Sequence, residues 1–405
     1  MKRQLTRLLL LSVFLLACDE MVCDPSDSDQ DLQSFLQYYG GPAKEEGRHV
    51  IPTSDGGLLI TASVIDIGEV WIIKTDRYGD SEWWKTYRHG GESSGVMSAE
   101  VDDGGYVVLS NTRDQVGENE LNAYCSLFRI DENGELLWLE LLGGDGWDNH
   151  VVANSMILDE GGNVLVLGTH IALPDEREGA LLSGILMRFN SSGEYLGGPW
   201  FELNDDTIGE SIFATSDGGY LMAFRCVSED DSQDYTSLVK YSVEDHEEWQ
   251  TDLSGLKLFT VGAWFHGLAS EVLWESPIGQ YNVIGKSSDG AEVKVNRLDA
   301  NGSIILNSTL GNQVATMPLT VASTSDGGFF FSGHGGFEDV SGFWVAKCDA
   351  DANLEWYSAR DEYILPFSIF ETELGYMTIV GGTSGPPHLS DDVALIVVDE
   401  NGVFD

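Results

Sequence analysis

The distribution of apolar residues along the chain predicts many short β-strands. Apolar runs rich in Val, Ile, Leu and Tyr recur throughout, as in YVVLSN at 106–111, VLVLGT at 164–169 and YMTIVGG at 376–382. β-Branched and aromatic residues favour strands, and runs this short are typical of strands rather than helices. We find no long stretch with the 3.6-residue periodicity of an amphipathic helix. The pattern therefore predicts an all-β fold.

A Gly-Gly phrase separates these runs and recurs seven times. The copies lie 47 to 61 residues apart, at 55–58, 103–106, 160–163, 217–220, 278–281, 326–329 and 373–376, and the fifth (IGQY) is degraded. Asp-Gly-Gly supplies the positive φ of a tight hairpin, so a strand should precede and follow each copy. A phosphate-binding loop would need a helix after the glycines, whereas here a strand follows.

A second phrase, Lys/Arg-x-Asp-x-Asn-Gly-x-x-x-Trp, lies downstream of most copies and is clearest in FRIDENGELLW at 128–138. It predicts a second hairpin, so each unit has four strands, which we call A to D in chain order. Four-stranded units at this period are typical of propeller blades. The sequence therefore predicts a seven-bladed β-propeller of four-stranded antiparallel blades. The tryptophans of the phrase should pack between blades; they are Trp83, Trp138, Trp249 and Trp356.

The two ends of the chain predict how the ring closes. The last unit ends at VALIVVDENGVFD, where its fourth strand should begin. The segment LQSFLQYYGG at 32–41 resembles the fourth strand LLWLELLGG at 136–144. We therefore expect the N-terminal strand to complete the seventh blade, which also hides strand edges that would otherwise favour aggregation.

The first 31 residues predict export and lipid anchoring. Residues 1–17 combine three basic residues with an apolar run at 8–16, which is typical of a signal peptide and too short to span a bilayer. The following Leu15-Leu16-Ala17-Cys18 resembles the bacterial lipobox, which implies a lipidated Cys18 as the first mature residue. Residues 18–31 then form an acidic tether, and 32–405 form the propeller domain. We expect an envelope protein, periplasmic or surface-exposed, that meets the membrane through its lipid anchor only.

The charge balance narrows the choice of partners. The chain has 67 acidic and 21 Lys or Arg residues, for a net charge of −46, and losing three basic signal residues changes this to −49. Such a surface repels the phosphates of nucleic acids, so we expect no nucleic acid partner. An envelope protein or a glycan is the expected partner. Generic solvation in a salty environment is the alternative explanation of the acidity.

The cysteines and histidines of the chain do not indicate a metal site. Cys125 and Cys348 lie in strand-like runs and should be small buried thiols, and no cysteine or histidine pair has metal-ligand spacing. We therefore expect no metal centre and no cofactor. DADANLE at 349–355 is the segment most similar to a calcium loop, and we interpret it as a plain hairpin, with bound calcium as the alternative.

The longer connections predict where a partner binds. The A–B and C–D turns share one face, called the turn face, whereas the longer B–C and D–A connections share the other, called the loop face. Loops on a rigid scaffold commonly carry binding residues. The richest cluster on this face is GGDGWDNH at 143–150, with Trp147 for stacking and Asp145, Asp148 and His150 for polar contacts. A capped connection between blades is the alternative reading of this segment.

The two repeated phrases resemble those of bacterial secreted β-propeller repeat proteins and, more loosely, of quinoprotein-like propellers, including the outer-membrane assembly lipoprotein that scaffolds β-barrel insertion. The resemblance covers residues 32–405 and implies the fold. Quinoprotein dehydrogenases typically carry adjacent cysteines at the cofactor, and this chain has no Cys-Cys pair. We therefore expect a binding or scaffold module of the cell envelope. The alternative is a propeller hydrolase or lyase acting on glycans, for which the sequence identifies no catalytic residues.

Overall fold

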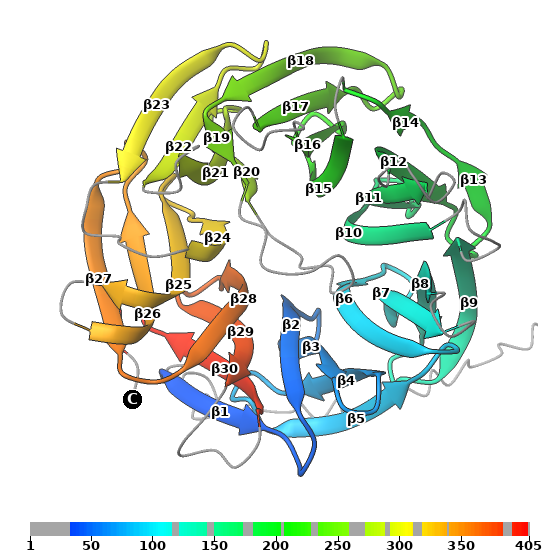
Figure 1. Ribbon diagram of the computed structural model, residues 1–405. Helices are drawn as coiled ribbons and strands as arrows, with labels where there is room; N and C mark the ends of the chain where they lie inside the picture. Colours follow the sequence, from blue (N-terminus) through cyan, green and yellow to red (C-terminus); the bar gives the residue numbers. More distant parts are fainter. Residues whose placement is uncertain are drawn as a thin grey trace, which may run out of the picture. The chain divides into compact units, whose positions relative to one another are not determined.

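The strands of the protein form seven antiparallel sheets arranged as a ring (Figure 1). The computed structural model describes residues 33–403 except 116–120, 144–149, 173–180, 204–205, 228–233, 259–271, 288–291, 311–317, 338–339 and 384–390. All described strands belong to one compact unit, Gln33–Asp405. The fold is a seven-bladed β-propeller, and the predicted fold class is confirmed.

The first four blades follow one another along the chain, each running from an inner strand A to an outer strand D. Blade 1 contains β2 (Glu45–Pro52), β3 (Leu58–Val64), β4 (Glu69–Thr75) and β5 (Ser81–Tyr87); blade 2 contains β6 (Glu92–Glu100), β7 (Tyr106–Gln115), β8 (Leu121–Ile130) and β9 (Leu136–Gly143). Blade 3 contains β10 (His150–Leu158), β11 (Val164–Ala172), β12 (Leu181–Phe189), β13 (Tyr195–Gly197) and β14 (Trp200–Phe201); blade 4 contains β15 (Asp206–Ala214), β16 (Tyr220–Val227), β17 (Tyr235–Tyr241) and β18 (Glu247–Ser254).

The remaining three blades complete the ring. Blade 5 contains β19 (Leu256–Lys257), β20 (Leu273–Glu275), β21 (Tyr281–Ser287), β22 (Val293–Leu298) and β23 (Ile304–Leu310). Blade 6 contains β24 (Pro318–Ser323), β25 (Phe329–Phe337), β26 (Val340–Cys348) and β27 (Leu354–Arg360). Blade 7 contains β28 (Ile364–Glu371), β29 (Met377–Thr383), β30 (Val393–Val398) and, from the other end of the chain, β1 (Phe35–Tyr39). No helix within the described ranges is both long and apolar enough to cross a membrane.

The N-terminal strand closes the ring as predicted. β1 pairs with β30 in antiparallel register, with Phe35 opposite Val397 and Tyr39 opposite Val393. The Tyr39 hydroxyl donates a 2.6 Å hydrogen bond to the carbonyl of Gly79 in blade 1. The strand therefore completes blade 7 and also contacts the blade that follows it around the ring.

Two blades depart from the predicted pattern of four continuous strands. In blade 3 strand D is split into β13 and β14 around Gly197-Gly198-Pro199, because proline has no N–H for the ladder and Gly197 has a φ of 93°. In blade 5 strand A is split as well, with β19 and β20 pairing separately with β21. The degraded fifth repeat gave no indication of this second split.

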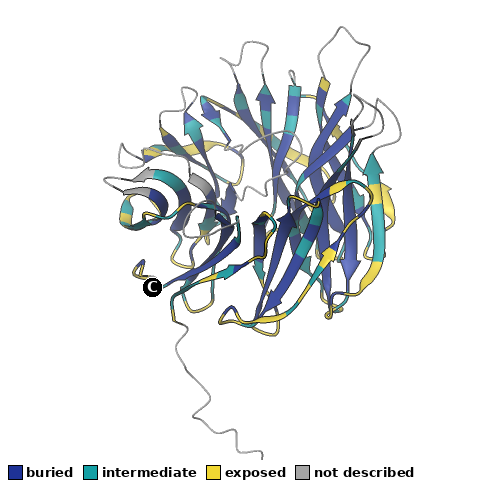
Figure 2. Ribbon diagram, turned by 60° about the horizontal axis from the view of Figure 1, so that its bottom comes forward, coloured by how far each residue is buried: buried dark blue, intermediate teal, exposed yellow. Residues whose placement is uncertain are grey.

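Most residues of the inner strands are buried, whereas exposed residues gather on the outer strands and turns (Figure 2). The buried apolar side chains form clusters that lie between neighbouring sheets. The layer between blades 1 and 2, for example, includes Leu59, Ile72, Val108 and Phe128, all less than 1% exposed. The middle strands bury apolar residues from both faces, as in β3, where Leu58 and Ile60 pack on one side and Leu59 on the other. This is expected for a sheet stacked between two others. Stability therefore depends on the contacts between blades, which we call seams.

Candidate functional site

Of the four residues predicted to bind a partner, the structure describes one. Asp145, Trp147 and Asp148 fall outside the described residues, so only His150 can be placed. His150 is the first residue of β10 and is 4% exposed. Its Nδ1 accepts a 2.9 Å hydrogen bond from the Ala123 amide, and burial lowers the pKa of its imidazole. This geometry gives His150 a structural contact between blades 2 and 3, while its predicted role in binding stays a prediction.

Other histidines at the loop-face strand ends are also buried or stacked. His89 packs at 4.6 Å from the Phe128 ring and His334 at 4.3 Å from Tyr363, measured between ring centroids. Burial lowers the pKa of both imidazoles. His170 packs at 4.5 Å against Trp200, whose indole is half exposed. A lowered pKa favours the neutral imidazole of His89 and His334 near pH 7, and both rings pack against aromatic side chains.

The segment compared with a calcium loop forms a hairpin turn. The Asp349 carboxylate accepts hydrogen bonds from the amides of Asp351 and Asn353 at 2.9 and 2.8 Å, and Glu355 pairs with Lys347 at 2.9 Å. Within the described ranges no cluster of three or more His, Cys, Asp or Glu residues has metal-binding geometry. Cys125 and Cys348 are buried and form no disulfide in the described part of the chain, in line with the predicted buried thiols, and Cys226 is buried too.

At each seam, one residue of strand D faces one residue in the C–D turn of the next blade. We call the strand D residue the seam residue. We call the residue that faces it, at the positive-φ position of the turn, the turn residue. In five seams an aromatic seam residue lies on a turn glycine: Trp83 on Gly134, Trp138 on Gly193, Trp249 on Gly302, Trp356 on Gly402 and Phe35 on Gly79. A Cβ on any of these glycines would lie 2.6 to 2.9 Å from the ring, so no other residue fits there. The predicted packing of the four tryptophans between blades is confirmed.

The two remaining seams lack both the aromatic seam residue and the turn glycine. The cross-strand positions place Gly197 in blade 3 and Leu306 in blade 5 as seam residues. The turn residues that face them are Asp245 and Ala352, the only non-glycine residues with positive φ in the described part of the chain. A Cβ is accommodated at these turns because no ring lies on them, although the left-handed conformation costs about 1 kcal/mol for a residue other than glycine.

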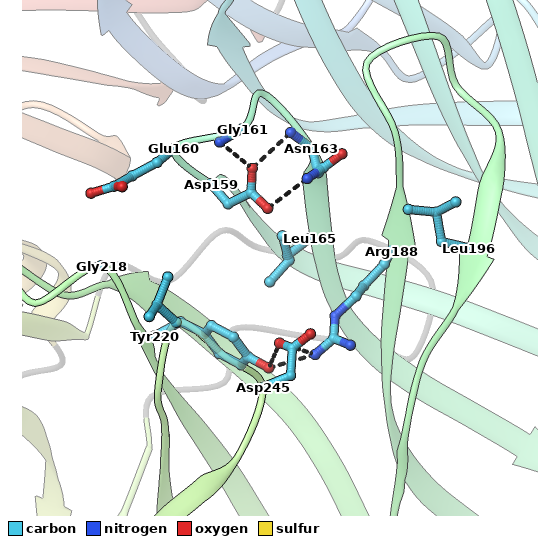
Figure 3. Close-up of a pocket in the computed structure, with 11 residues that line it drawn as sticks. Asp159, Glu160, Gly161, Asn163, Leu165, Arg188, Leu196, Gly218, Tyr220 and Asp245 are labelled. Atoms are coloured by element: carbon cyan, nitrogen blue, oxygen red, sulfur yellow. Dashed lines mark hydrogen bonds and ion pairs between the residues drawn. The ribbon is translucent and has the colours of Figure 1, made fainter.

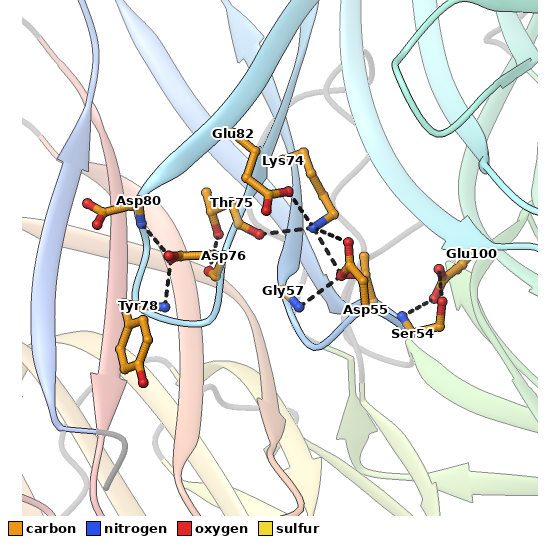
Figure 4. A network of polar contacts seen from close by, with 11 residues as sticks. Ser54, Asp55, Gly57, Lys74, Thr75, Asp76, Tyr78, Asp80, Glu82 and Glu100 are labelled. Atoms are coloured by element: carbon orange, nitrogen blue, oxygen red, sulfur yellow. Dashed lines mark hydrogen bonds and ion pairs between the residues drawn. The ribbon is translucent and has the colours of Figure 1, made fainter. Parts of the chain in front are cut away.

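A buried cation accompanies the seam residue on the neighbouring strand C. Lys74 pairs across the strands with Trp83, is 2% exposed, and its Nζ reaches Asp55 at 2.9 Å and Glu82 at 3.0 Å (Figure 4). Lys240 with Asp217, Lys347 with Asp326 and Arg129 with Asp103 repeat the arrangement. In blade 7 both positions are apolar, with Leu374 in the A–B turn and Val397 on β30.

The acids of these pairs are held in their ionised form. Burial alone would raise the pKa of Asp55, but hydrogen bonds from Thr53, Lys74 and the Gly57 amide outweigh it and lower the pKa to about 2. Asp326 has the same balance of burial against hydrogen bonds, and its pKa is also about 2. The pairs are therefore charged at neutral pH and tie the A–B turn to strands C and D.

Blades 3 and 5 have lost the acid and use an arginine that reaches the next blade. Gly161 and Ile278 occupy the position of Asp55, as the backbone hydrogen bonds of the turns show. Arg297 of blade 5 donates to the Ala350 carbonyl of blade 6, in the same way that the Trp249 indole donates to Ala300 at 3.0 Å. Arginine thus replaces the indole as donor at this seam.

Arg188 plays the corresponding part in blade 3, where it borders a pocket (Figure 3). Its Nη2 donates to Asp245 and to the Tyr220 hydroxyl of blade 4, at 2.6 Å each. The pocket has a volume of about 220 Å³ and opens on the turn face between the two blades. Its other lining residues include Leu165, Leu196, Val243, Asp159 and Glu160.

This pocket was not predicted from the sequence, because the long connections placed the candidate binding residues on the loop face. The signal was nevertheless present in two repeats. Asn190-Ser191-Ser192-Gly193 is followed by Gly197 where other repeats have tryptophan, and the next repeat has Asp245 where most have glycine. Each departure alone looks like drift in a degenerate repeat, and only their contact across the seam shows that they form one site.

Comparisons with solved structures support the fold. A protein of unknown function from Dyadobacter fermentans is 12% identical, with a TM-score of 0.50 over 76% of this chain and 94% of its own. Hydrazine synthase from Kuenenia stuttgartiensis is 11% identical, with a TM-score of 0.54 over 85% of this chain and 94% of its own. No protein-family model and no curated protein sequence matches the chain. At these identities the likeness shows the fold alone, so the fold defines the class: a seven-bladed β-propeller.

Proposed function

We propose that the protein is a lipid-anchored binding or scaffold module of the bacterial cell envelope, which holds an envelope protein or a glycan on its loop face. The propeller fold supports a binding or scaffold role in general. The observation that carries the proposal is the closed ring, in which the strands of every blade are fixed by pairing and the strand ends that precede the longer connections lie on one face. A rigid scaffold of this kind presents loops without a large ordering cost on binding.

The direction in which β1 enters the ring supports an outward orientation of the loop face. Phe35 begins β1 beside Gly79, a residue of the blade 1 C–D turn, so the chain enters blade 7 at the turn face. Gly40, just after β1, lies beside Asp392 at the loop-face start of β30. The described part of the chain therefore begins at the turn face, and we propose that the loop face is directed away from an anchoring membrane.

The anchor is tested by replacing Cys18 with serine. We expect Cys18→Ser to move the protein from the membrane fraction to the soluble fraction and to abolish labelling by an alkyne fatty acid, because stable anchoring needs the acyl chains. Cys23→Ser, in the same acidic segment, is the matched control and should remain membrane-bound and labelled. Unchanged membrane association and labelling of Cys18→Ser would rule out the anchor.

The binding face is tested with the body of the protein, residues 32–405, in which all described strands pair among themselves. A pull-down from envelope extract and a glycan array should identify a partner. Trp147→Ala with Asp148→Ala should then weaken binding at least tenfold, in the range of a lost aromatic hot spot.

The matched control for this test lies on the turn face. Asp102→Ala with Glu132→Ala removes two exposed carboxylates that make no hydrogen bond within their turns. This double variant should leave the affinity for the partner unchanged. If this control loses binding while folded and the Trp147 and Asp148 variant retains it, the partner occupies the turn face and the proposal is wrong.

A further inference from the structure

We propose that the pocket between blades 3 and 4, which we call the seam pocket, binds a small organic cation with a planar apolar body, such as an aromatic amine. The inference is independent of the loop face and of the anchor, because the pocket lies among A–B and C–D turns on the turn face. Three features of the seam carry it: its free space, its apolar wall and its unbalanced negative charge.

The free space follows from the missing seam residue. A Cβ on Gly197 would have no other atom within 4 Å, whereas a tryptophan fills the equivalent space in four other seams. The pocket of about 220 Å³ exceeds the cavity of about 150 Å³ that accommodates benzene in a well-studied protein core. A bicyclic ring of the size of indole is therefore a reasonable match for the volume.

The apolar wall comes from both blades. Leu165 on β11 is buried, whereas Leu196 and Val243 are 56% and 61% exposed and border the mouth. Isolated exposed aliphatic residues are common, but these two line one cavity together with the buried Leu165. Covering them with a planar ring would remove apolar surface from water, which favours binding.

The charge of the lining selects a cation. Asp159, Glu160 and Asp245 contribute three negative charges, and the one positive charge of Arg188 is already paired with Asp245 at 2.6 Å. Asp159 accepts hydrogen bonds from the Gly161 and Asn163 amides and so belongs to its own turn.

Glu160 is the carboxylate that remains for a ligand. Among the described residues nothing donates to its carboxylate or forms an ion pair with it. A Cβ on Gly218 would lie 3.5 Å from its Oε1, so this side chain reaches across the seam towards blade 4. We therefore assign Glu160 as the partner of the ligand ammonium group, with Asp159 adding to the negative potential beside it.

The experiment compares three probes that share one ring and differ in charge. Tryptamine, indole and indole-3-acetate are titrated by calorimetry into the full chain in nonionic detergent. We expect tryptamine to bind with a 1:1 ratio and a Kd on the order of 1 mM, the affinity expected for a small ligand of about 12 heavy atoms. Indole should bind about threefold to fivefold more weakly, because one exposed ion pair is worth up to about 1 kcal/mol. Indole-3-acetate should bind at least tenfold more weakly.

Variants then locate the site. Glu160→Gln should weaken tryptamine binding threefold to fivefold and bring its affinity close to that of indole. Asp102→Asn, at the equivalent turn position of blade 2, is the matched control and should change nothing. Val243→Trp and, independently, Leu196→Trp should abolish binding of all probes by covering the pocket, and both positions are exposed enough to accept the larger side chain.

Two results would overturn the proposal. Equal affinity for the three probes would show that charge plays no part. Unchanged tryptamine binding in a folded Val243→Trp or Leu196→Trp variant would show that the probe binds elsewhere. Neither result bears on the loop face, which is tested by its own variants.

Discussion

Deleting residues 33–41 should lower the free energy of unfolding by about 5 kcal/mol. The deletion removes the outer strand of blade 7 and its contacts with blade 1, including the Phe35 ring on Gly79 and the Tyr39 hydrogen bond. Burial of roughly 200 Å² of apolar surface at about 25 cal/mol per Å² accounts for the figure. The deletion also exposes the edge of β30, whose residues Val393 to Val398 are almost fully buried in the intact ring. Chemical denaturation of the intact and shortened proteins measures the difference.

The matched control deletes nine residues of the acidic segment, 20–28, and should leave the midpoint unchanged. A milder variant, Phe35→Ala, keeps the strand and removes only the ring from the seam, with an expected loss of about 2 to 3 kcal/mol. A synthetic peptide of residues 33–43 added to the shortened protein should restore part of the stability by adding the missing strand. A shortened protein as stable as the intact one would contradict the role assigned to β1.

Removing the carboxylate partner of a buried lysine should cost more than removing both residues of the pair. Lys240 is fully buried, and its Nζ contacts Asp217, Glu248 and the Tyr241 carbonyl at 2.9 to 3.2 Å. Asp217→Leu should destabilise the protein by about 3 kcal/mol, because the buried ammonium loses its closest carboxylate. Asp217→Leu combined with Lys240→Val reproduces the apolar pair that blade 7 already uses, Leu374 with Val397, and should cost only about 1 to 2 kcal/mol.

A double-mutant cycle from denaturation of the four proteins measures this coupling, which we expect to be about 2 kcal/mol or more. Asp102→Leu, an exposed acid in the equivalent turn of blade 2, controls for the general effect of removing charge from so acidic a chain. It should stay within about 0.5 kcal/mol of the parent. Additive single substitutions, with no coupling between Asp217 and Lys240, would show that the pair is not a unit.

The fold could be predicted because turn chemistry repeats with a fixed meaning. Asp-Gly-Gly and Asp-x-Asn-Gly impose hairpins wherever they occur, so the number of blades and the order of strands follow from local sequence. The closing strand could be predicted because 32–41 matches a strand D that is missing at the other end of the chain. The split inner strand of blade 5 could not, because the segment between Leu256 and Leu273 carries no turn phrase to fix its pairing.

The candidate sites were less predictable for a different physical reason. His150 lies in a polar, aromatic segment and reads as exposed, yet the β-ladder buries it and gives its Nδ1 a backbone donor. The seam pocket depends on Gly197 and Asp245, which belong to different repeats and meet only when two blades stack. Turns can be predicted from local sequence. A contact between two repeats can be predicted only if the contacting positions of both repeats are compared together.

The pairing of seam and turn residues limits how such a protein can change by duplication or exchange of repeats. A blade carries half of each of its two seams, so a blade with a seam tryptophan placed before blade 4 would set its ring against Asp245. Blade 3 placed before a blade with a turn glycine would leave that glycine uncovered. Blades 3 and 4 are matched to each other through Gly197 and Asp245, as blades 5 and 6 are through Leu306 and Ala352. The segment that keeps a seam intact therefore runs from strand D of one blade to the C–D turn of the next, as from Gly197 to Asp245. An exchange of repeats preserves these pairs only if it begins and ends inside a C–D hairpin, between a turn residue and the seam residue that follows it.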